Sequence, residues 1–511
     1  QNDMATIRLL SKKKKRGKKF YLTATKKPGE LVCFAAVTGC LTRMEKLKYE
    51  KEKDIQLSEQ DRWRRNLILE HNMWKTVLVI CLPLALYQMM NQIFKVVDTR
   101  MAAHINSMAV SSVTYLSQIN NMVSALGGGL AVGASLKISQ AYGEGNFVLV
   151  KSRVSSLYVM SIFLGVGVFF LLVPFHRGFL LLMNTPEEII TMGQMYFKVE
   201  VCSMSIRFFN NVYIAVERAR GNTRRILCLN VEIILIKLAL TAFFVYVLNG
   251  TMTMIAAATL TAELVMMFHA VKNTFLEKSV FSFSPKMVRW NKQVSLPMVA
   301  ISVPVICEKL AFSLGKVLVN SMSTFYGALV IGALGVSNNI AGMVTAPFNG
   351  FQEGVSAIIS QNRGAGNERR ALEAFYKILV VNSCIGLCGF LLTGLAIRPV
   401  SQMFAEANHQ FANQIVDIYR YDMAGNLMLG LNASVMALLY GYGKTKIAML
   451  INFARLFVFR VPVLWFLQNY TDVGERSVGL VMLISHIGVG AVSALVGIHE
   501  VIGLKRKIKQ N

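Results

Sequence analysis

The chain has 511 residues, of which 54% are hydrophobic and only 16% are charged. A water-soluble protein carries roughly 25% charged residues, so this composition argues against an ordinary soluble protein. The net charge of +26 could indicate a nucleic-acid partner, but the positions of the charges, described below, argue against one.

Residues 1–75 precede the first long apolar run. Residues 1–43 are strongly basic and include the run KKKKRGKK, which could bind anionic lipid headgroups. The sequence begins without Met, and Met44 opens a different stretch of mixed charge. We therefore expect 1–43 to be dispensable or not part of the native protein, and 44–72 to form a short amphipathic or charged lead-in helix.

Long apolar runs then follow one another to residue 503. A bilayer core of about 30 Å needs about 20 apolar residues per helix, and a backbone in lipid must satisfy its own hydrogen bonds. The sequence therefore predicts an all-α integral membrane protein with twelve transmembrane helices. The runs cover 76–103, 108–141, 152–176, 189–217, 225–248, 251–271, 294–322, 328–361, 371–396, 411–440, 446–468 and 477–503.

Lys and Arg are unevenly divided among the loops between these runs. Alternate loops are rich in them, and the intervening loops carry only Arg100, Arg177, Arg398 and Arg476. Positive residues concentrate in cytoplasmic loops. The alternation supports the number of runs, explains the positive charge without nucleic acid, and predicts that both termini are cytoplasmic.

A segment of 64 residues recurs 221 positions later in the chain. Residues 83–146 align without gaps with residues 304–367, and 17 of the 64 positions are identical. The shared residues include Pro, Gly, Gln, Asn and Ser, so chance similarity between apolar helices is a poor explanation. At an offset of 222, Gly221 also meets Gly443. The chain is therefore predicted to contain two pseudo-symmetric six-helix halves.

Six runs per half give both repeats the same orientation, a plan in which the substrate path lies between the halves. We expect a first half at 76–271, a cytoplasmic linker at 272–293, a second half at 294–503 and a cytoplasmic C-terminus at 504–511. The motif Ser-Gln-x-x-Gly-x-Gly-Asn ends the second run of each half. We interpret it as a structural turn.

These features resemble the multidrug and toxic compound extrusion (MATE) family. The resemblance rests on the 6+6 repeat, on VVDT at 96–99, on APFNGFQEGVSAIISQNRGAGNERR at 346–370, and on the GNTRR and GKTK turns. It covers about 76–503. It implies a V-shaped twelve-helix exporter that expels cationic, amphipathic compounds in exchange for Na⁺ or H⁺.

The resemblance also assigns a cation site to the first half. The family usually has an acidic residue late in the first helix, and Asp98 matches it. It often has Asn and Asp four residues apart in the fifth helix, where this chain has Lys237 and Thr241. A Lys at mid-span cannot be a Na⁺ ligand, so this position departs from the family pattern.

A charge at bilayer depth is costly and needs a partner or a wet cavity. One hypothesis is a switchable pair of Asp98 and Lys237, in which protonation of Asp98 frees the helix to bend. The alternative is a static pair that locks two helices, with Lys95 extending outward. In the second half the acidic candidates are Glu308, partnered by a neighbouring Lys, and Glu353.

Uncharged polar residues cluster on two of the predicted helices. Side chains of this kind can line a substrate cavity or bond between helices. The candidates are Gln118, Asn120, Asn121, Asn210 and Asn211.

The function predicted from these features is secondary active antiport of drug-like molecules across the cell (plasma or inner) membrane by a monomer. The main rival is a flippase for a lipid-linked saccharide, which many Arg and Lys residues facing the cavity would favour. No nucleophile–base set, metal cluster or nucleotide loop is visible. We therefore expect no enzyme, no catalytic residue, no metal and no tightly bound cofactor beyond H⁺ or Na⁺ as coupling ion.

Overall fold

The computed structural model describes residues 57–103, 107–183, 185–277, 279–405 and 408–510. Residues 1–43 and residues 44–56 of the predicted lead-in stretch lie outside these ranges. Within the described ranges the chain is built of helices joined by short turns, and it has no strand there. Four long helices, α3 (Met73–Ala103), α4 (Ser107–Gly143), α10 (Ser295–Ser323) and α11 (Ala328–Gly364), pack against one another where the two predicted segments 76–271 and 294–503 meet. We call these segments the first and second half, and the place where they meet the junction.

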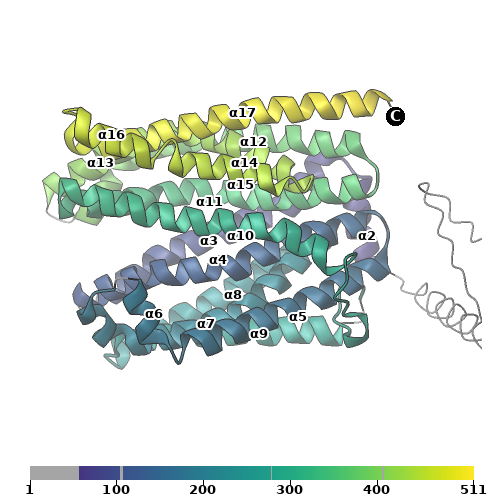
Figure 1. Cartoon of the computed structure of the whole chain (residues 1–511), viewed down its shortest axis with the longest axis horizontal. Helices are drawn as coiled ribbons and strands as arrows, with labels where there is room; N and C mark the ends of the chain where they lie inside the picture. The colour runs from purple at the N-terminus through teal and green to yellow at the C-terminus, as the bar shows by residue number, and fades with distance from the viewer. Residues whose placement is uncertain (1–56, 104–106, 184, 278, 406–407, 511) are drawn as a thin grey trace, which may run out of the picture. The chain divides into compact units, whose positions relative to one another are not determined.

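The remaining helices pack outside this junction, as Figure 1 shows. Those of the first half are α5 (Phe147–Leu172), α6 (His176–Leu182), α7 (Glu187–Arg220), α8 (Thr223–Ala242) and α9 (Met252–Leu276). Those of the second half are α12 (Glu368–Ala405), α13 (His409–Ala424), α14 (Asn426–Gly441), α15 (Thr445–Phe457), α16 (Val461–Tyr470) and α17 (Ser477–Gln510). Across the junction, α4 packs along α10 and α3 packs along α11.

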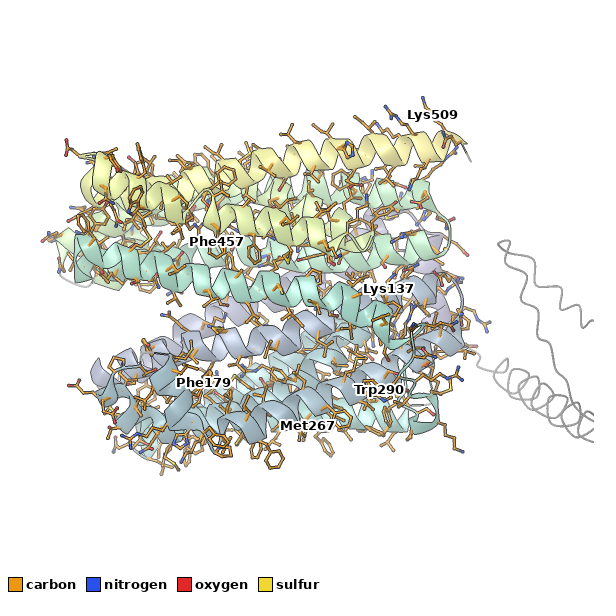
Figure 2. The ribbon with its side chains drawn as sticks, in the orientation of Figure 1. Lys137, Phe179, Met267, Trp290, Phe457 and Lys509 are labelled. Carbon is orange, nitrogen blue, oxygen red and sulfur yellow. The ribbon has the colours of Figure 1, made fainter. Side chains whose placement is uncertain are left out.

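Ten helices in the described ranges are long and apolar enough to cross a membrane, and the bent pair α13–α14 makes an eleventh. Helix α7 has 34 residues but carries several charged side chains, among them Lys198, Glu200 and Arg207. Large apolar side chains face outward along the bundle, such as Leu395, which is 83% exposed, and Phe163, which is 66% exposed. Figure 2 draws the side chains on the ribbon and labels two other exposed aromatic residues, Trp290 and Phe457. Water would disfavour such a surface, whereas lipid accommodates it.

Two of the predicted continuous helices are broken. The run 411–440 forms α13 and α14, which meet at Gly425 with a bend of 46°. The run 446–468 forms α15 and α16, separated at residues 458–460. Pro462 lies in the first turn of α16, where its missing N–H prevents the helical hydrogen bond that would continue α15.

The repeated Ser-Gln-x-x-Gly-x-Gly-Asn motif forms a turn in both halves. Helix α4 ends at Gly143 and α11 ends at Gly364. Gly145 and Gly366 follow with φ of 73° and 79°, a backbone conformation that glycine adopts at little cost. The structural turn predicted from the sequence is therefore present at both positions.

These two turns contact each other across the junction. A Cβ atom added at Gly143 would lie 1.9 Å from the backbone carbonyl oxygen of Gln361, and one added at Gly364 would lie 2.1 Å from that of Gln140. Gly143 and Gly364 are repeat mates, and so are Gln140 and Gln361. The absence of side chains at both glycines lets the backbones of the two halves touch here.

Helix α2 (Glu59–Leu69) lies at the same end of the bundle, which we call the α2 end. Arg65 Nη2 donates to the carbonyl of Gly143 over 3.1 Å. From the second half, Asn362 Nδ2 and Arg370 Nη2 donate to the carbonyl of Ile68 over 3.3 and 3.1 Å. Helix α2 is part of the predicted lead-in helix, and it bonds to both halves.

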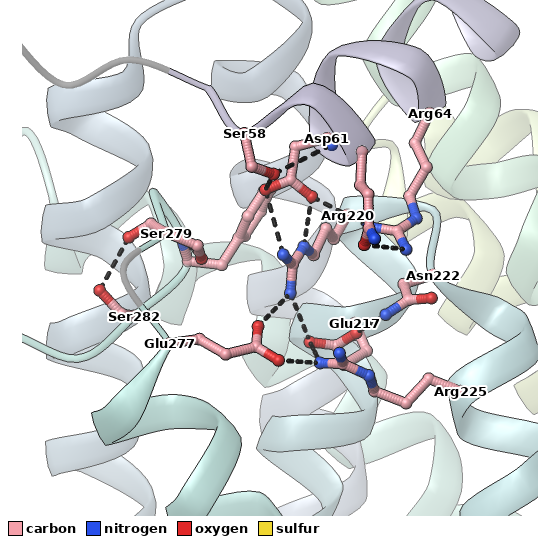
Figure 3. A network of polar contacts seen from close by, with 12 residues as sticks. Ser58, Asp61, Arg64, Glu217, Arg220, Asn222, Arg225, Glu277, Ser279 and Ser282 are labelled. Atoms are coloured by element: carbon pink, nitrogen blue, oxygen red, sulfur yellow. Dashed lines mark hydrogen bonds and ion pairs between the residues drawn. The ribbon is translucent and has the colours of Figure 1, made fainter.

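A buried charge network anchors α2 to the first half (Figure 3). Arg220 makes two bonds to Asp61, Nε–Oδ1 at 2.5 Å and Nη2–Oδ2 at 3.1 Å. Arg220 also binds Glu217 and Glu277, and Arg225 lies 2.7 Å from Glu277. Burial of Asp61 disfavours its charged form, but the Arg220 guanidinium outweighs this and holds the pKa of Asp61 below its ordinary value of 3.8.

Candidate functional site

A cavity of about 660 Å³ lies between the two halves. Helices α3, α4 and α7 of the first half and α10, α11, α13, α14, α15 and α17 of the second half contribute to its wall. Sites for drug-sized molecules have volumes of roughly 300–1,000 Å³. The cavity is therefore large enough for a small organic molecule, and it lies where the repeat predicts the substrate path.

The polar residues expected to line a cavity fall into two groups. Asn121 and Asn211 line it. The other three, Gln118, Asn120 and Asn210, are not part of its wall. Asn210 is instead buried against α9, where its Nδ2 donates to Glu263 Oε2 over 2.8 Å. Helix α7 thus turns Asn211 to the cavity and Asn210 into the packing.

The first-half charge candidates are only partly described. Lys95 on α3 lines the cavity. Asp98 lies on α3, but its side chain is outside the described residues, so its pairing with Lys237 stays a prediction. Lys237 and Thr241, both on α8, are not part of the cavity wall. Thr241 is fully buried, and its hydroxyl has no hydrogen-bond partner among the described residues.

Glu308 on α10 lines the cavity, as does Lys309, and its hydrogen bonds come from other helices. Tyr440 Oη donates to Glu308 Oε2 over 2.6 Å, and Asn452 Nδ2 donates to Oε1 over 2.8 Å. Lys309, one of the lysines expected as a partner, attracts this carboxylate electrostatically. Glu308 is a carboxylate held by neutral donors from α14 and α15.

Glu353 on α11 also lines the cavity. Its Oε2 lies 2.6 Å from Arg218 Nη2 on α7, so this ion pair joins the two halves. Gln88 on α3 donates to the same oxygen over 3.4 Å. The ion pair lies on the cavity wall that faces the α2 end.

The break between α15 and α16 places two arginines in the cavity wall. Arg455 is on the last turn of α15, and Arg460 is the residue before α16. Their Nη2 atoms lie 3.1 and 3.4 Å from His486 Nε2 on α17. His486 Nδ1 lies 3.4 Å from Asp422 Oδ1 on α13.

Lys316 and Phe312, one turn apart on α10, complete this part of the wall. Lys316 Nζ lies 4.8 Å from the centre of the Phe312 ring, and the Arg455 guanidinium lies 5.6 Å from it. Aromatic faces attract cations at such distances. We call Lys316, Arg455 and Arg460 the basic cluster.

The described wall carries more cations than carboxylates. The carboxylates are Glu308, Glu353 and Asp422, and the cations are Lys95, Arg218, Lys309, Lys316, Arg455 and Arg460. With His486 neutral, the described wall has a formal surplus of three positive charges. This surplus exceeds the single charge that Asp98 could add.

Sequence reasoning did not predict the basic cluster as a cavity feature. One signal was available for Lys316, because its repeat mate Lys95 also lines the cavity. The position of Arg460 depends on the helix break, for which Pro462 is a local signal, and the position of His486 depends on the packing of α17, which no local pattern encodes.

A protein-family model and several known proteins match this chain. The family model MatE matches the chain twice, at residues 83–243 and 304–466. A probable multidrug resistance protein of Bacillus subtilis (strain 168), YoeA, is 21% identical over 416 residues, which are 78% of this chain and 88% of that protein. The probable multidrug resistance protein NorM of Thermotoga maritima is 21% identical over 415 residues, 78% of this chain and 87% of that protein.

Solved structures share the fold. An outward-facing multidrug resistance MATE family transporter of the MOP superfamily superposes with a TM-score of 0.83 at 17% identity, covering 88% of this chain and 99% of that one. A MOP superfamily transporter from Pyrococcus furiosus, described as having a binding pocket of reverse polarity that suggests a different function, superposes with a TM-score of 0.82 at 17% identity and the same coverage.

Proposed function

The chain belongs to the MatE family, whose members are transporters rather than enzymes, and on that premise we propose that it is a secondary active antiporter that exports amphipathic small molecules. The cavity between the halves carries this proposal. Its volume suits a drug-sized molecule, and it is lined from both halves. Alternating access, in which the halves rock about a central site, would open this cavity to each side in turn.

The proposal includes twelve spans in two pseudo-symmetric halves. The two MatE matches start 221 residues apart, at 83 and 304, and α7 would be the span that its charged residues conceal. Close contacts also recur at this offset. A Cβ at Gly133 would lie 2.5 Å from Ser302 Cα, and one at Gly354 would lie 2.5 Å from Cys81 Sγ. Both pairs are repeat mates, which supports a common plan for α4–α10 and α11–α3.

The family resemblance implies a cationic, amphipathic substrate, but the proposal does not include a positive charge on the substrate. A cation entering the described wall would meet a surplus of like charge, which disfavours binding. The reversed pocket polarity described for the Pyrococcus furiosus transporter supports leaving the sign of the substrate charge open in this fold. The amphipathic part is retained, because the wall mixes polar groups with Phe312, Phe348 and Met436.

The coupling ion is proposed to be H⁺ or Na⁺. In the second half Glu308 is the candidate, because a carboxylate that faces a cavity can exchange a proton or hold a cation. In the first half the candidate is the Asp98–Lys237 pair. Membrane location is supported by the ten or eleven apolar helices, and we propose the cell membrane, cytoplasmic termini and a monomer.

The surplus of Arg and Lys in the described wall is the feature expected of the flippase rival, but the matched relatives are named as multidrug resistance proteins, so the rival is not favoured. The test is efflux in inside-out vesicles that contain the full chain, with Na⁺ and H⁺ gradients imposed separately. We expect one gradient to drive movement of an amphipathic dye and the other to have little effect. No movement under either gradient would contradict antiport. If Glu308→Gln and Asp98→Asn both retain full coupling, neither carboxylate carries the coupling ion.

A further inference from the structure

Two of the three carboxylates of the described cavity wall are already engaged by protein groups. Glu353 is in an ion pair with Arg218 at 2.6 Å. Glu308 accepts hydrogen bonds from Tyr440 and Asn452. Among the described residues, neither carboxylate is in an ion pair with a member of the basic cluster. Binding of a cationic group at either position would therefore require it to displace an existing partner.

The basic cluster, by contrast, has no such ion pair: within the described residues, Lys316, Arg455 and Arg460 form no ion pair with a carboxylate. Arg460 is only 4% exposed, and the Nε atoms of both arginines lack a hydrogen-bond partner among the described residues. A buried cation without a counter-charge is costly. The cluster therefore has unsatisfied donors and unbalanced charge at one place on the cavity wall.

His486 fixes how the two arginines point. Both guanidinium groups donate toward His486 Nε2, so that nitrogen must supply its lone pair and cannot carry a proton. The proton is then on Nδ1, which faces Asp422 Oδ1 at 3.4 Å. His486 is thus neutral and supplies no counter-charge, so the two arginines share the single nearby carboxylate of Asp422, which lies on the far side of the ring.

We propose that this cavity binds an amphipathic anion, with a carboxylate, sulfonate or phosphate group on Lys316, Arg455 and Arg460. Guanidinium groups bind such anions with charge-assisted and often bidentate hydrogen bonds. The apolar part of the molecule then lies against Phe348, Met436 and Met482, which line the same cavity. This inference rests on the proposed transport function and names the substrate class of its site.

The repeat adds an independent argument for a charge-selective cavity. Lys95 and Lys316 are repeat mates, one in each half, and both line the same cavity. Together with Lys309 they distribute positive charge over both sides of the space. Such a distribution attracts an anion that enters the cavity before it reaches the basic cluster.

The decisive experiment compares two probes with the same apolar body. The full chain is purified into nanodiscs of phosphatidylcholine, and binding of radiolabelled naphthalene-2-sulfonate is measured against naphthyl-2-trimethylammonium. We expect the sulfonate to bind at least about tenfold more tightly, a difference of about 1.4 kcal/mol. Tighter binding of the ammonium probe would overturn the proposal.

Variants then locate the site. Arg455→Gln and Arg460→Gln should each weaken sulfonate binding by about tenfold or more and leave ammonium binding unchanged or stronger. Arg460→Lys keeps the charge and should retain part of the affinity. Lys272→Gln, at an exposed position of α9 outside the cavity, is the matched control and should bind as the wild type does.

The fold of each variant is checked by its elution profile and thermal melting. If Arg460→Gln fails to fold, Lys316→Gln replaces it, because Lys316 is exposed to the cavity and not packed in the core. If none of the three substitutions to Gln weakens sulfonate binding, the proposal is overturned. Competition by dioctanoyl phosphatidic acid would support the same anion site and identify a lipid as its source, whereas competition only by free sulfonates would identify a soluble one.

Vesicle transport separates this inference from the transport proposal. If the sulfonate binds but moves under neither gradient, antiport fails and the anion site stands. If only the ammonium probe is exported, antiport stands and the anion site fails.

Discussion

The α2 end and the cavity both contain buried arginines, but their charges are balanced differently. At the α2 end, Arg64, Arg220 and Arg225 meet Asp61, Glu217 and Glu277, one carboxylate for each guanidinium (Figure 3). In the basic cluster, Arg455 and Arg460 share a neutral histidine, and Asp422 lies behind it.

This difference separates structural charges from charges reserved for a ligand. A buried ion pair is stable only when each charge has its counter-charge, as at the α2 end. The basic cluster is incomplete without an anion. Removing an arginine should therefore have opposite consequences in the two regions.

The largest effect is expected for Arg220→Gln. This substitution leaves Asp61 and Glu217 buried without their main counter-charge, and breaking a buried pair in this way costs about 3–5 kcal/mol. We expect a large fall in melting temperature or loss of folded protein, measured by thermal melting in detergent. If Arg220→Gln melts at the same temperature as the wild type, the network does not hold α2.

Acid should loosen the same network. The pKa of Asp61 is lower in the folded protein than its ordinary value of 3.8, so its stabilising effect is complete above that value and is lost as the pH falls through the folded pKa. The melting temperature should drop over this range. In Asp61→Asn this part of the drop in melting temperature should be missing. If the melting temperature of Asp61→Asn follows the same pH profile as that of the wild type, the drop comes from other carboxylates.

A smaller loss is expected for Gly143→Ala. The added methyl group would lie 1.9 Å from the carbonyl oxygen of Gln361, and overpacking of this kind costs about 1–3 kcal/mol. Gly167→Ala is the matched control, because nothing lies within 4 Å of the added atom there. Equal melting temperatures for both variants would contradict a tight contact between the halves at Gly143.

Arg460→Gln should change stability little, although Arg460 is as buried as Arg220. It removes a buried charge whose nearby carboxylate, Asp422, is separated from it by His486, so we expect a change within about 1 kcal/mol, or a gain. Naphthalene-2-sulfonate should raise the melting temperature of the wild type and not of this variant. A loss as large as that of Arg220→Gln would show that the basic cluster is structural.

The smallest effect is expected at the surface. Arg177 and Glu187 form a 2.6 Å pair, as short as those at the α2 end, but their side chains are 65% and 56% exposed. Water and salt screen such pairs, so Arg177→Gln should cost less than about 1 kcal/mol. A large effect on melting would mean that distance, rather than burial, decides the strength of these pairs.

Local sequence patterns predicted the helices and the turns well. Long apolar runs identify membrane helices because lipid imposes one requirement on every residue of the run, and the repeated glycines identify turns because only a small residue fits there. The family resemblance was likewise readable from the repeat and its turns, and the MatE matches confirm it.

The chemistry of the cavity was less predictable. Which of two adjacent residues faces the cavity, as for Asn210 and Asn211, depends on helix rotation set by packing. The partners of Glu308 come from positions 440 and 452, more than a hundred residues away. Arg455 and Arg460 both reach His486 because α15 ends before Arg460. The hydrophobic periodicity of the sequence does not show these contacts.

The contact between Gly143 and Gly364 restricts how the molecule can move at the α2 end. Two backbones that touch without intervening side chains have no compressible layer between them, so they cannot yield by small side-chain adjustments. If the halves part here, the glycine contacts and the bonds of α2 to both halves must be lost together. Opening at this end is then a switch with two positions rather than a graded loosening.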